Sequence, residues 1–418
     1  MFELKKHGTT VRTEVIAGLT TFAAMAYILM VNPGMFANLD GVSFDAVYIA
    51  TALSAVIGTV LIGLLANLPL AQASGMGLNA FFVYTVCFGF GFSYANALVF
   101  VLVDGLVFIL LTVTGLRKLI FDAIPAAVKT AIPAGIGLFI ALLGAKNCGL
   151  IVANDAKNCL SFGDLASPSV IVAAIGFLIL MVIKARNVPG GMILAIVLTT
   201  IVGIPFGVTH APEQIFSLPA GIGKQFMNID FLGALNFAYI PFLIALFVPD
   251  FFSTFGTVLG VGAKAGYLDK DGNLPGIDKC FKVDAISTSL GALFGMPSMT
   301  TYLESSAGVE AGGKTGLTVI FTSIFFGISL FLAPLALVIP SAATGPVLIF
   351  IGINMLSAMK NIDYSDITEY IPAFLCVTFT IFANNIANGI CVALPAYLVM
   401  KIATGKIKKI DPVMYVLV

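Results

Sequence analysis

Long apolar runs, separated by charged or Gly/Pro-rich breaks, repeat along the whole chain. A helix needs about 20 apolar residues to cross a bilayer. The runs predict fourteen membrane spans, at 14–37, 47–68, 72–90, 94–114, 125–145, 168–186, 190–208, 237–262, 283–296, 300–313, 316–334, 336–356, 370–384 and 386–403. The alternating pattern of outer-membrane β-strands is not what the chain shows. Because helices are the other way to satisfy the backbone in lipid, the pattern predicts an all-α polytopic membrane protein.

The composition also indicates a protein that lies in a lipid bilayer. Hydrophobic residues make up 59% of the 418 residues, charged residues 10%, and the mean hydropathy is +1.06, whereas soluble proteins average about 25% charged residues. The six cysteines are scattered, with no CxxC pair and no Cys/His cluster. We therefore expect no metal and no cofactor. An enzyme is not expected, since no nucleophile paired with a base and no sizeable soluble domain is visible.

The basic residues predict the orientation in the membrane. With the N-terminus in the cytoplasm, 18 of the 21 lysines and arginines fall on the cytoplasmic side, and Lys146, Lys157 and Lys224 fall outside. This asymmetry follows the positive-inside rule. An even number of spans returns the C-terminus to the same side. The sequence therefore predicts a multi-pass protein of the cell (plasma or inner) membrane with both termini cytoplasmic.

Two predicted spans are interrupted by glycine and proline at corresponding places. Residues 69–82 read PLAQASGMGLNAFF in the third span, and residues 295–313 read GMPSMTTYLESSAGVEAGG in the tenth, the third span of a second set of seven. Interrupted segments at matching positions indicate an inverted-repeat transporter with a binding site at the membrane midplane. We divide the chain into a first seven-span repeat (1–210), an extracellular connection (211–236) and a second seven-span repeat (237–418).

Three acids inside the predicted spans are candidates for function. A charged side chain at the bilayer centre costs roughly 2.5–3.5 kcal/mol, so each acid needs a pairing or functional explanation. Glu304 lies in the broken tenth span, Asp250 lies in the eighth span, and Asp104 lies in the fourth. Asp250 is either a substrate or proton site or a buried acid bonded to helix hydroxyls. Asp104 is either a structural partner of another helix or part of a proton path.

The residues around Glu304 indicate what it could bind. The stretch reads as an extended segment leading into a short helix, for which Thr300 and Thr301 are plausible caps. Free amides at such a helix end are donors, and the glutamate is an acceptor. This arrangement suits a neutral ligand with N–H donors and ring acceptors, and a carboxylate in lipid is also suited to proton coupling.

Other candidates flank the same segments. Asn79 lies in the broken third span, where its amide could donate to and accept from a ligand or cap a short helix. Phe81 and Phe82 follow it, and Phe251 follows Asp250. These rings could stack on a planar ligand or pack in the core.

Several motifs resemble one family in the same order. They are RTEVIAGLTTFAAMAYILMVNP (12–33), GMGLNAFF (75–82), DFFSTFGTVLGV (250–261), TTYLESSAGVEAGGKTGLT (300–318) and IANGI (386–390). The sequence resembles the AzgA-like adenine, guanine and hypoxanthine permeases, which belong with the nucleobase/cation symporters and nucleobase-ascorbate transporters. The resemblance runs along the whole chain.

The resemblance implies a core domain of spans 1–4 and 8–11 and a gate domain of spans 5–7 and 12–14. It also implies short strands in spans 3 and 10, an elevator-like movement and a homodimer. The family's binding positions fall on Asn79, Asp250 and Glu304. One position departs from the family, because Ser253 stands where the eighth-span motif commonly carries a second aspartate. The identity of the purine is therefore left open.

Together these features predict a secondary active transporter that imports hypoxanthine, guanine or adenine by proton symport with alternating access. The expected substrate contacts are Asn79, Asp250, Glu304, Phe81, Phe82, Phe251, Thr301 and Ser305, and the proton-coupling candidates are Glu304, Asp250 and Asp104. The alternatives are a same-fold transporter of uracil, xanthine or an anion, and a membrane-embedded enzyme or receptor.

Overall fold

The computed structural model describes residues 2–114, 125–154, 159–188, 190–210, 214–219, 226–231, 277–383, 386–407, 410–412 and 414–417, together with residues 250, 254, 257, 258, 261, 262, 265 and 267. These residues are mainly helical. The helices are α1 (Val11–Met25), α2 (Ile28–Phe36), α3 (Phe44–Leu65), α4 (Met76–Ala80), the π-helix η1 (Phe81–Gly89), α5 (Tyr94–Thr114), α7 (Ala126–Asn147), α8 (Pro168–Ala185), α9 (Gly191–Gly203), α11 (Ile277–Leu293), α12 (Ser305–Glu310), α13 (Gly316–Ser329), η4 (Leu330–Leu332), α14 (Ala333–Leu337), α15 (Ser341–Leu356), η5 (Ser357–Asn361), α16 (Ile367–Phe382), α17 (Ile386–Ala403) and α18 (Met414–Leu417). The strands are β1 (Gln72–Ser74), β2 (Ile151–Asn154), β3 (Cys159–Phe162) and β4 (Met299–Thr301).

Six helical stretches among the described residues are long and apolar enough to cross a membrane. They are Val11–Phe36, Phe44–Leu65, Tyr94–Thr114, Ala126–Asn147, Pro168–Ala185 and Gly316–Leu337. The prediction of a multi-pass helical membrane protein is confirmed. The predicted eighth span, 237–262, lies mostly outside the described residues. The stretch Val11–Phe36 covers the predicted first span, and within it a two-residue turn separates α1, which ends at Met25, from α2, which starts at Ile28.

Hydroxyl and carboxylate side chains cap several of these helices. Thr10 Oγ1 accepts from the backbone N–H of Thr13 at the start of α1, and Ser43 does the same for α3. Ser167 caps α8, where Pro168 occupies the first turn and needs no hydrogen-bond partner for its nitrogen. Such caps satisfy amides that a helix leaves unpaired at its start.

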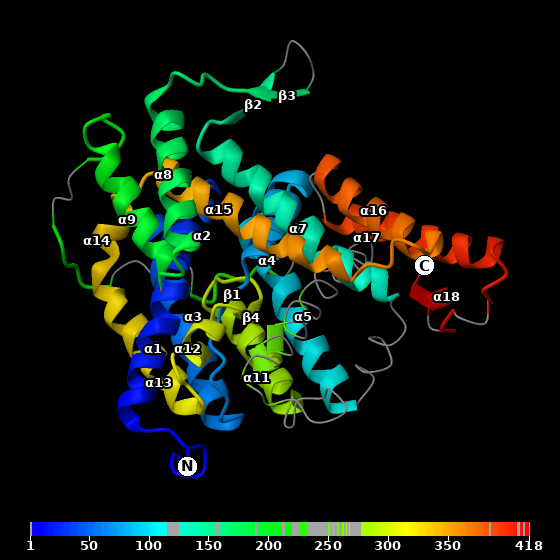
Figure 1. The fold of residues 1–418 in the computed structure, drawn as a ribbon, viewed down its shortest axis with the longest axis horizontal. Coiled ribbons are helices and arrows are strands. Elements are labelled where there is room, and N and C mark those ends of the chain that lie inside the picture. Colours follow the sequence, from blue (N-terminus) through cyan, green and yellow to red (C-terminus); the bar gives the residue numbers. More distant parts are fainter. Residues whose placement is uncertain are drawn as a thin grey trace.

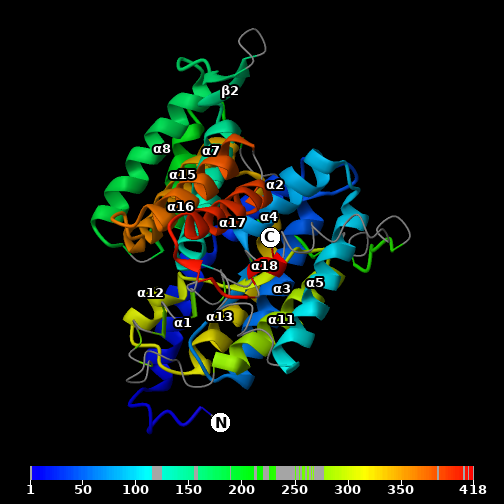
Figure 2. The same cartoon turned by 90° about the vertical axis from the view of Figure 1, so that its right-hand side faces the viewer.

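The helices form two groups. The first helix group contains α1, α3, α5, α11, α12 and α13, and the second contains α7, α8, α9, α15, α16 and α17. Figures 1 and 2 show the first group in the lower part of the molecule and the second in the upper part, with β1 and β4 near the centre. The site described below is built mainly on the first group.

Paired glycines bring two helices of the second group into backbone contact. Gly137 and Gly144 on α7 face Gly352 and Gly345 on α15. A Cβ atom added at Gly345 would lie 2.8 Å from the carbonyl oxygen of Gly144, and one at Gly352 would overlap the carbonyl oxygen of Gly137. Small residues allow this close approach in membranes, where helix association depends on packing.

Replacing one of these glycines should separate the two helices. We expect Gly352→Ala to lower the stability of the purified protein by about 1–3 kcal/mol, because the added methyl group overpacks a backbone contact. Gly327→Ala on α13 is the matched control, since no atom lies within 4 Å of its added Cβ and alanine favours a helix by up to about 1 kcal/mol. Melting curves in detergent measure both variants, and equal melting temperatures for them would contradict the packing argument.

Charged side chains gather where α16 begins and α17 ends. Lys401 is 2% exposed, and its Nζ lies 2.7 Å from Glu369 Oε1 and 2.6 Å from Thr368 Oγ1. Asp366, the N-cap of α16, accepts a hydrogen bond from Lys406 Nζ at 2.7 Å. The hydrogen bonds from Lys406 and from Thr368 hold the pKa of the Asp366 carboxyl well below its usual range.

This lowered pKa predicts a pH-dependent contribution to stability. A carboxyl with a lowered folded-state pKa stabilises the fold above its unfolded pKa of about 3.9, and the contribution is lost as the pH falls through the folded value. Asp366→Asn should therefore melt at a lower temperature than the unmodified protein at neutral pH. The difference should shrink as the pH is lowered below about 4. Melting curves across this range, with Lys406→Met as the reciprocal variant, check the expectation, which a constant difference at all pH values would contradict.

Candidate functional site

The two interrupted segments meet as a pair of short strands. β1 and β4 are antiparallel, with Gln72 opposite Thr301 and Ser74 opposite Met299. The backbone pairing continues past the strands, because Gly75 donates to Ser298 and Tyr302 donates to the carbonyl of Ala71, each at 3.0 Å. These bonds satisfy backbone groups that would otherwise be unpaired at a helix break, at a cost of several kcal/mol each in hydrocarbon.

A short helix follows each strand. After β1 the chain enters α4, which runs directly into η1, and after β4 it enters α12. Thr300 and Thr301 lie in β4, so the expectation that they cap the following helix is wrong. Glu304 occupies the cap position of α12 instead, and it makes no side-chain capping bond. The pairing of the strand with β1 explains the difference, because it draws both threonines into extended backbone.

Glu304 accepts a hydrogen bond from the turn between α1 and α2. The hydroxyl of Tyr27 donates to Glu304 Oε1 at 2.8 Å. Tyr27 is buried and lies between α1 and α2. The site therefore includes a residue that the sequence reading missed, since a tyrosine in an apolar run gives no charge signal. A break within the first span would have been the clue.

Asn79 belongs to a fully buried amide network. Its Nδ2 lies 2.6 Å from Asn32 Oδ1, and its Oδ1 accepts from Ser74 Oγ at 2.7 Å. Asn32 in turn donates to Thr51 Oγ1 at 2.8 Å. The network joins β1 and α4 to α2 and α3, so it fixes the first broken segment against its neighbours. That Asn79 also contacts a substrate stays a prediction.

A second network lies beneath the strand pair and is centred on Asp284, a buried acid on α11. Asp284 Oδ1 accepts from Gln72 Nε2 at 3.0 Å and from Thr254 Oγ1 at 2.9 Å. Thr254 also shares a hydrogen bond of 2.8 Å with Thr300. Asp284 was not among the expected site residues, because it falls at the edge of a predicted span beside Lys282. The hydroxyls Ser287 and Thr288, three and four residues later, were the available signal.

Asp250 and Asp104 are both buried. Asp250 precedes Thr254, a member of the Asp284 network, by four residues. Asp104, on α5, lies within electrostatic range of Asp250 and Asp284. Gly105, the next residue, packs directly against Ser289 of α11. The structure thus brings two of the predicted acids, Asp104 and Asp250, near a third that was not predicted, whereas Glu304 bonds to Tyr27 in a separate network.

The other residues predicted to contact substrate, where the structure describes them, are buried inside the protein. Phe81 and Phe82 are buried in the hydrophobic core, and the Phe82 ring stacks on Phe36 with centroids 5.7 Å apart. Ser305 Oγ accepts from the amide of Ala71 at 3.0 Å, and Thr301 is buried in β4. Phe251 and the substituted position 253 lie outside the described residues. Roles in substrate binding stay predictions for all of them.

Glu14 fixes the start of α13 to α1. This buried carboxylate accepts from the backbone amides of Lys314 and Thr318, at 3.1 and 3.0 Å, and from the hydroxyls of Thr315 and Thr318. A negative charge is favoured at a helix N-terminus, and hydrogen bonds to a charged acceptor are strong. The clamp aligns α1, which leads to Tyr27, with the segment that follows Glu304.

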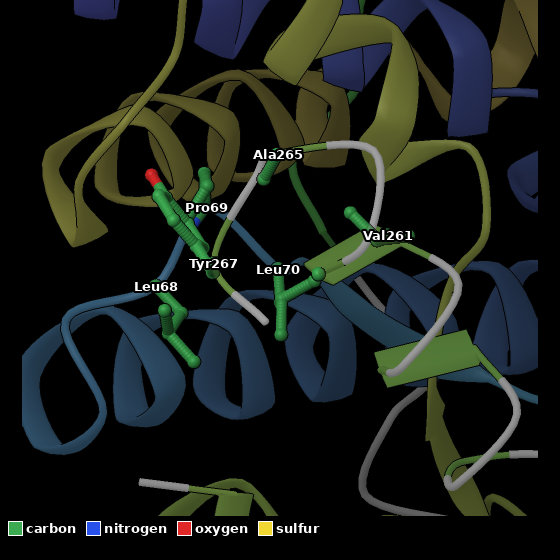
Figure 3. A pocket seen from close by; sticks show the side chains of 7 residues that line it. Leu68, Pro69, Leu70, Val261, Ala265 and Tyr267 are labelled. Carbon is green, nitrogen blue, oxygen red and sulfur yellow. The ribbon is translucent and has the colours of Figure 1, made fainter. Parts of the chain in front are cut away.

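A crevice outside this site is lined by uncharged residues. Leu68, Pro69, Leu70, Val261, Gly262, Ala265 and Tyr267 line it. Figure 3 shows that its walls come from the chain after α3 and from Val261, Ala265 and Tyr267. The lining has no charged side chain, so it offers little to a polar ligand. Among the described residues, no group of three His, Cys, Asp or Glu side chains could hold a metal ion.

The fold is that of known membrane transporters. The transmembrane domain of the cyanobacterial bicarbonate transporter BicA superposes with a TM-score of 0.65 at 16% identity, covering 91% of this chain and 97% of that one. The murine Solute Carrier 26 family member A9 anion transporter, in its inward-facing state, gives a TM-score of 0.67 at 13% identity, covering 94% and 68%. At these identities the likeness shows a shared fold.

Sequence comparison identifies the family. The Permease family model matches residues 12–391, so the chain belongs to that family. Two relatives from Escherichia coli are adenine permease AdeQ, 38% identical over 97% of this chain and 91% of its own, and adenine permease AdeP, 37% identical over 99% and 92%. Guanine/hypoxanthine permease PbuO of Bacillus subtilis is 37% identical over 100% and 97%. The expected resemblance to purine permeases is confirmed, and the chain is a transporter, not an enzyme.

The Glu14 clamp predicts a loss of stability when its charge is removed. Glu14→Gln keeps the shape but places an amide NH₂ against groups that donate, so we expect a loss of about 1–3 kcal/mol. Melting curves in detergent measure the loss. Glu3→Gln, at an exposed acid of the N-terminal segment, is the control and should change the melting temperature little. Equal effects of the two substitutions would show that the clamp does not hold α13.

Proposed function

We propose that this protein imports purine nucleobases by proton symport with alternating access. The observation that carries the proposal is the full-length similarity to adenine and guanine/hypoxanthine permeases. The site supports it, since the half-buried acid Glu304 lies just after β4, where two broken segments pair, and transporters of this kind bind substrate at such breaks. The permease family and the multi-pass helical fold exclude the competing membrane enzyme.

Glu304 is the proposed centre of substrate recognition. Its side chain is partly exposed, and Tyr27 orients one of its oxygens. A carboxylate so held can accept hydrogen bonds from two adjacent N–H groups of a purine. Asp250 is proposed to contact a second edge of the ring and Asn79 a third, with Thr301 and Ser305 beside them. Phe81, Phe82 and Phe251 are proposed to form the apolar wall of the site.

The proton is proposed to move on Glu304, Asp250 or Asp104. Isolated acids in lipid are costly when charged and mark proton paths in transporters. Asp284 joins the candidates because it faces the same strands. Ser253 stands where the family pattern has an aspartate, and the uptake experiment below distinguishes adenine, guanine and hypoxanthine. The two relatives named for adenine and the one named for guanine and hypoxanthine match at nearly equal identity.

The finer architecture is also a proposal. We infer fourteen spans in two inverted repeats, 1–210 and 237–418, with both termini in the cytoplasm of a cell whose plasma or inner membrane holds the protein. The first helix group is proposed to be the core domain and the second the gate domain, which slide past each other like an elevator. The location of β1 and β4 in the third and tenth predicted spans supports the repeat. A homodimer is proposed from the family resemblance.

An uptake experiment tests the substrate class. Cells that lack their own purine permeases should accumulate labelled hypoxanthine, guanine or adenine when they make this protein. We expect half-saturation at micromolar concentration, which corresponds to a binding free energy of about 8 kcal/mol. Collapse of the proton gradient should abolish accumulation. Absence of uptake with the protein present in the membrane would exclude purines, and uptake of uracil, xanthine or an anion instead would favour the same-fold alternative.

Glu304→Gln separates binding from coupling in the same assay. Glutamine retains one acceptor oxygen but cannot carry an exchangeable proton. We expect counterflow exchange of substrate to persist at reduced affinity while proton-driven accumulation is lost. Thr114→Ser, at an exposed position on α5, is the control and should behave like the unmodified protein. Unchanged accumulation by Glu304→Gln would assign the proton to another acid.

A further inference from the structure

Two buried threonines bond to the outer edges of the strand pair. Thr59 lies on α3, and its Oγ1 donates to the carbonyl of Gln72 at 2.8 Å and accepts from the Gln72 amide at 3.0 Å. Thr288 lies on α11, and it donates to the carbonyl of Met299 and accepts from its amide, each at 3.2 Å. A hydroxyl can do both, because it has one donor hydrogen and two acceptor lone pairs. We call Thr59 and Thr288 the supporting threonines.

Their hydrogen bonds fall where each strand has no strand beside it. In an antiparallel pair, alternate residues direct their backbone groups toward the partner strand and away from it. Ala71 and Gly75 bond to the second broken segment. Gln72, which lies between them, directs its amide and carbonyl to Thr59 instead. Such edge groups are costly inside a membrane when they lack a partner, so each supporting threonine takes the place of a neighbouring strand.

The same arrangement occurs in both halves of the chain. Each supporting threonine belongs to the helix that directly precedes its strand, α3 before β1 and α11 before β4. A glycine on each helix lets the strand come close. A Cβ atom added at Gly58 would lie 3.3 Å from Gln72 Cβ, and one added at Gly291 would lie 3.0 Å from Met299 Cγ. The repeated combination of threonine, glycine and strand indicates a support that belongs to the site.

Other buried threonines of this protein bond within their own helix. Thr199 on α9 donates to the carbonyl of Ala195 at 2.7 Å, and Thr380 on α16 donates to the carbonyl of Cys376 at 2.8 Å. This bond to the residue four positions earlier is a common choice for a threonine inside a helix. The supporting threonines give their hydrogen to a strand instead. They therefore connect a helix to a broken segment.

We propose that Thr59 and Thr288 are positioning residues for the substrate site. Each hydroxyl fixes one strand against its helix, and the strand fixes the short helix that follows it. β1 leads into α4, which carries Asn79, and β4 leads to Glu304 at the start of α12. Binding groups must be held within about 0.5 Å of their productive geometry. The proposal rests on the proposed function, since the substrate contacts of Asn79 and Glu304 belong to it.

Hydrogen exchange tests the support without any substrate. Thr288→Val keeps the branched shape of the side chain but leaves the amide of Met299 without its acceptor. We expect this amide to exchange about tenfold faster, because a lost buried hydrogen bond favours local opening. Thr288→Ser restores the hydroxyl and should keep exchange slow. Mass spectrometry with residue-level fragmentation measures the rate, and an unchanged rate in Thr288→Val overturns the proposal.

The first half of the chain offers the same test. Thr59→Val should speed exchange at the amide of Gln72, and Thr59→Ser should not, because the serine hydroxyl can still accept from that amide. Equal exchange at Gln72 in the valine variant and the unmodified protein would show that the support does not act on β1.

Counterflow exchange of labelled purine tests whether the support positions the site. In Thr59→Val and Thr288→Val we expect the half-saturating concentration to rise about tenfold, while the maximal rate per transporter changes by less than about twofold. The serine variants should restore the half-saturating concentration. A partial loss of folded protein would lower the total rate without changing this concentration. Faster amide exchange with an unchanged half-saturating concentration therefore contradicts the positioning role.

Thr199→Val is the matched control, since it removes a buried hydroxyl that bonds within its own helix. It should leave both readouts unchanged, and effects equal to those of Thr288→Val would overturn the proposal. If Thr288→Val yields no folded protein, Thr288→Cys takes its place. A thiol is a weaker donor and acceptor than a hydroxyl, so both readouts should rise by less, and unchanged readouts count against the support.

The two readouts separate this proposal from the proposed function. If the unmodified protein takes up no purine, the proposed function fails and the substrate contacts of the site fail with it. The amide exchange of Gln72 and Met299 still decides whether the supporting threonines hold the strands. If purine uptake is normal and both readouts are unchanged in the valine variants, the proposed function stands and the positioning role is wrong.

Discussion

A backbone amide inside a bilayer has no water to bond with, and this constraint explains the central architecture of the protein. Two spans are interrupted by glycine and proline, so each leaves amides and carbonyls that a helix would have paired. The pairing of β1 with β4 supplies the missing partners, and Gly75 and Tyr302 extend it at either end. Without this pairing, the breaks would be too costly to exist at membrane depth.

The polar networks of the site are attached to this strand pair. Ser74, at the end of β1, bonds to Asn79, and Gln72, at its start, bonds to Asp284. Glu304 follows β4 by three residues and meets the break between α1 and α2 at Tyr27. The three breaks thus occur at one place, which concentrates polar atoms where the surrounding helices are apolar. A transporter needs such a place, because a solute must leave water without entering lipid.

How much of this could be predicted from sequence depends on the kind of signal. Glu304 and the two broken segments were identified because charge, glycine and proline stand out in apolar runs. The partners were harder to find. Tyr27 looks like any interfacial tyrosine until the break beside it is known, and Asp284 lies next to lysines that suggest a loop. Thr300 and Thr301 were placed at a helix cap, although long-range pairing with β1 makes them strand residues. Local patterns carry no information about a partner segment hundreds of residues away.

That separation has a consequence for how the protein is made. The Tyr302 hydroxyl donates to the carbonyl of Ser74, although the two residues are 228 positions apart in the sequence. The first broken segment therefore enters the membrane long before the ribosome has synthesised its partner. During that interval its backbone must be covered by the translocation machinery, by water or by other parts of the nascent chain. Each broken segment thus depends on the other half of the chain for its backbone hydrogen bonds.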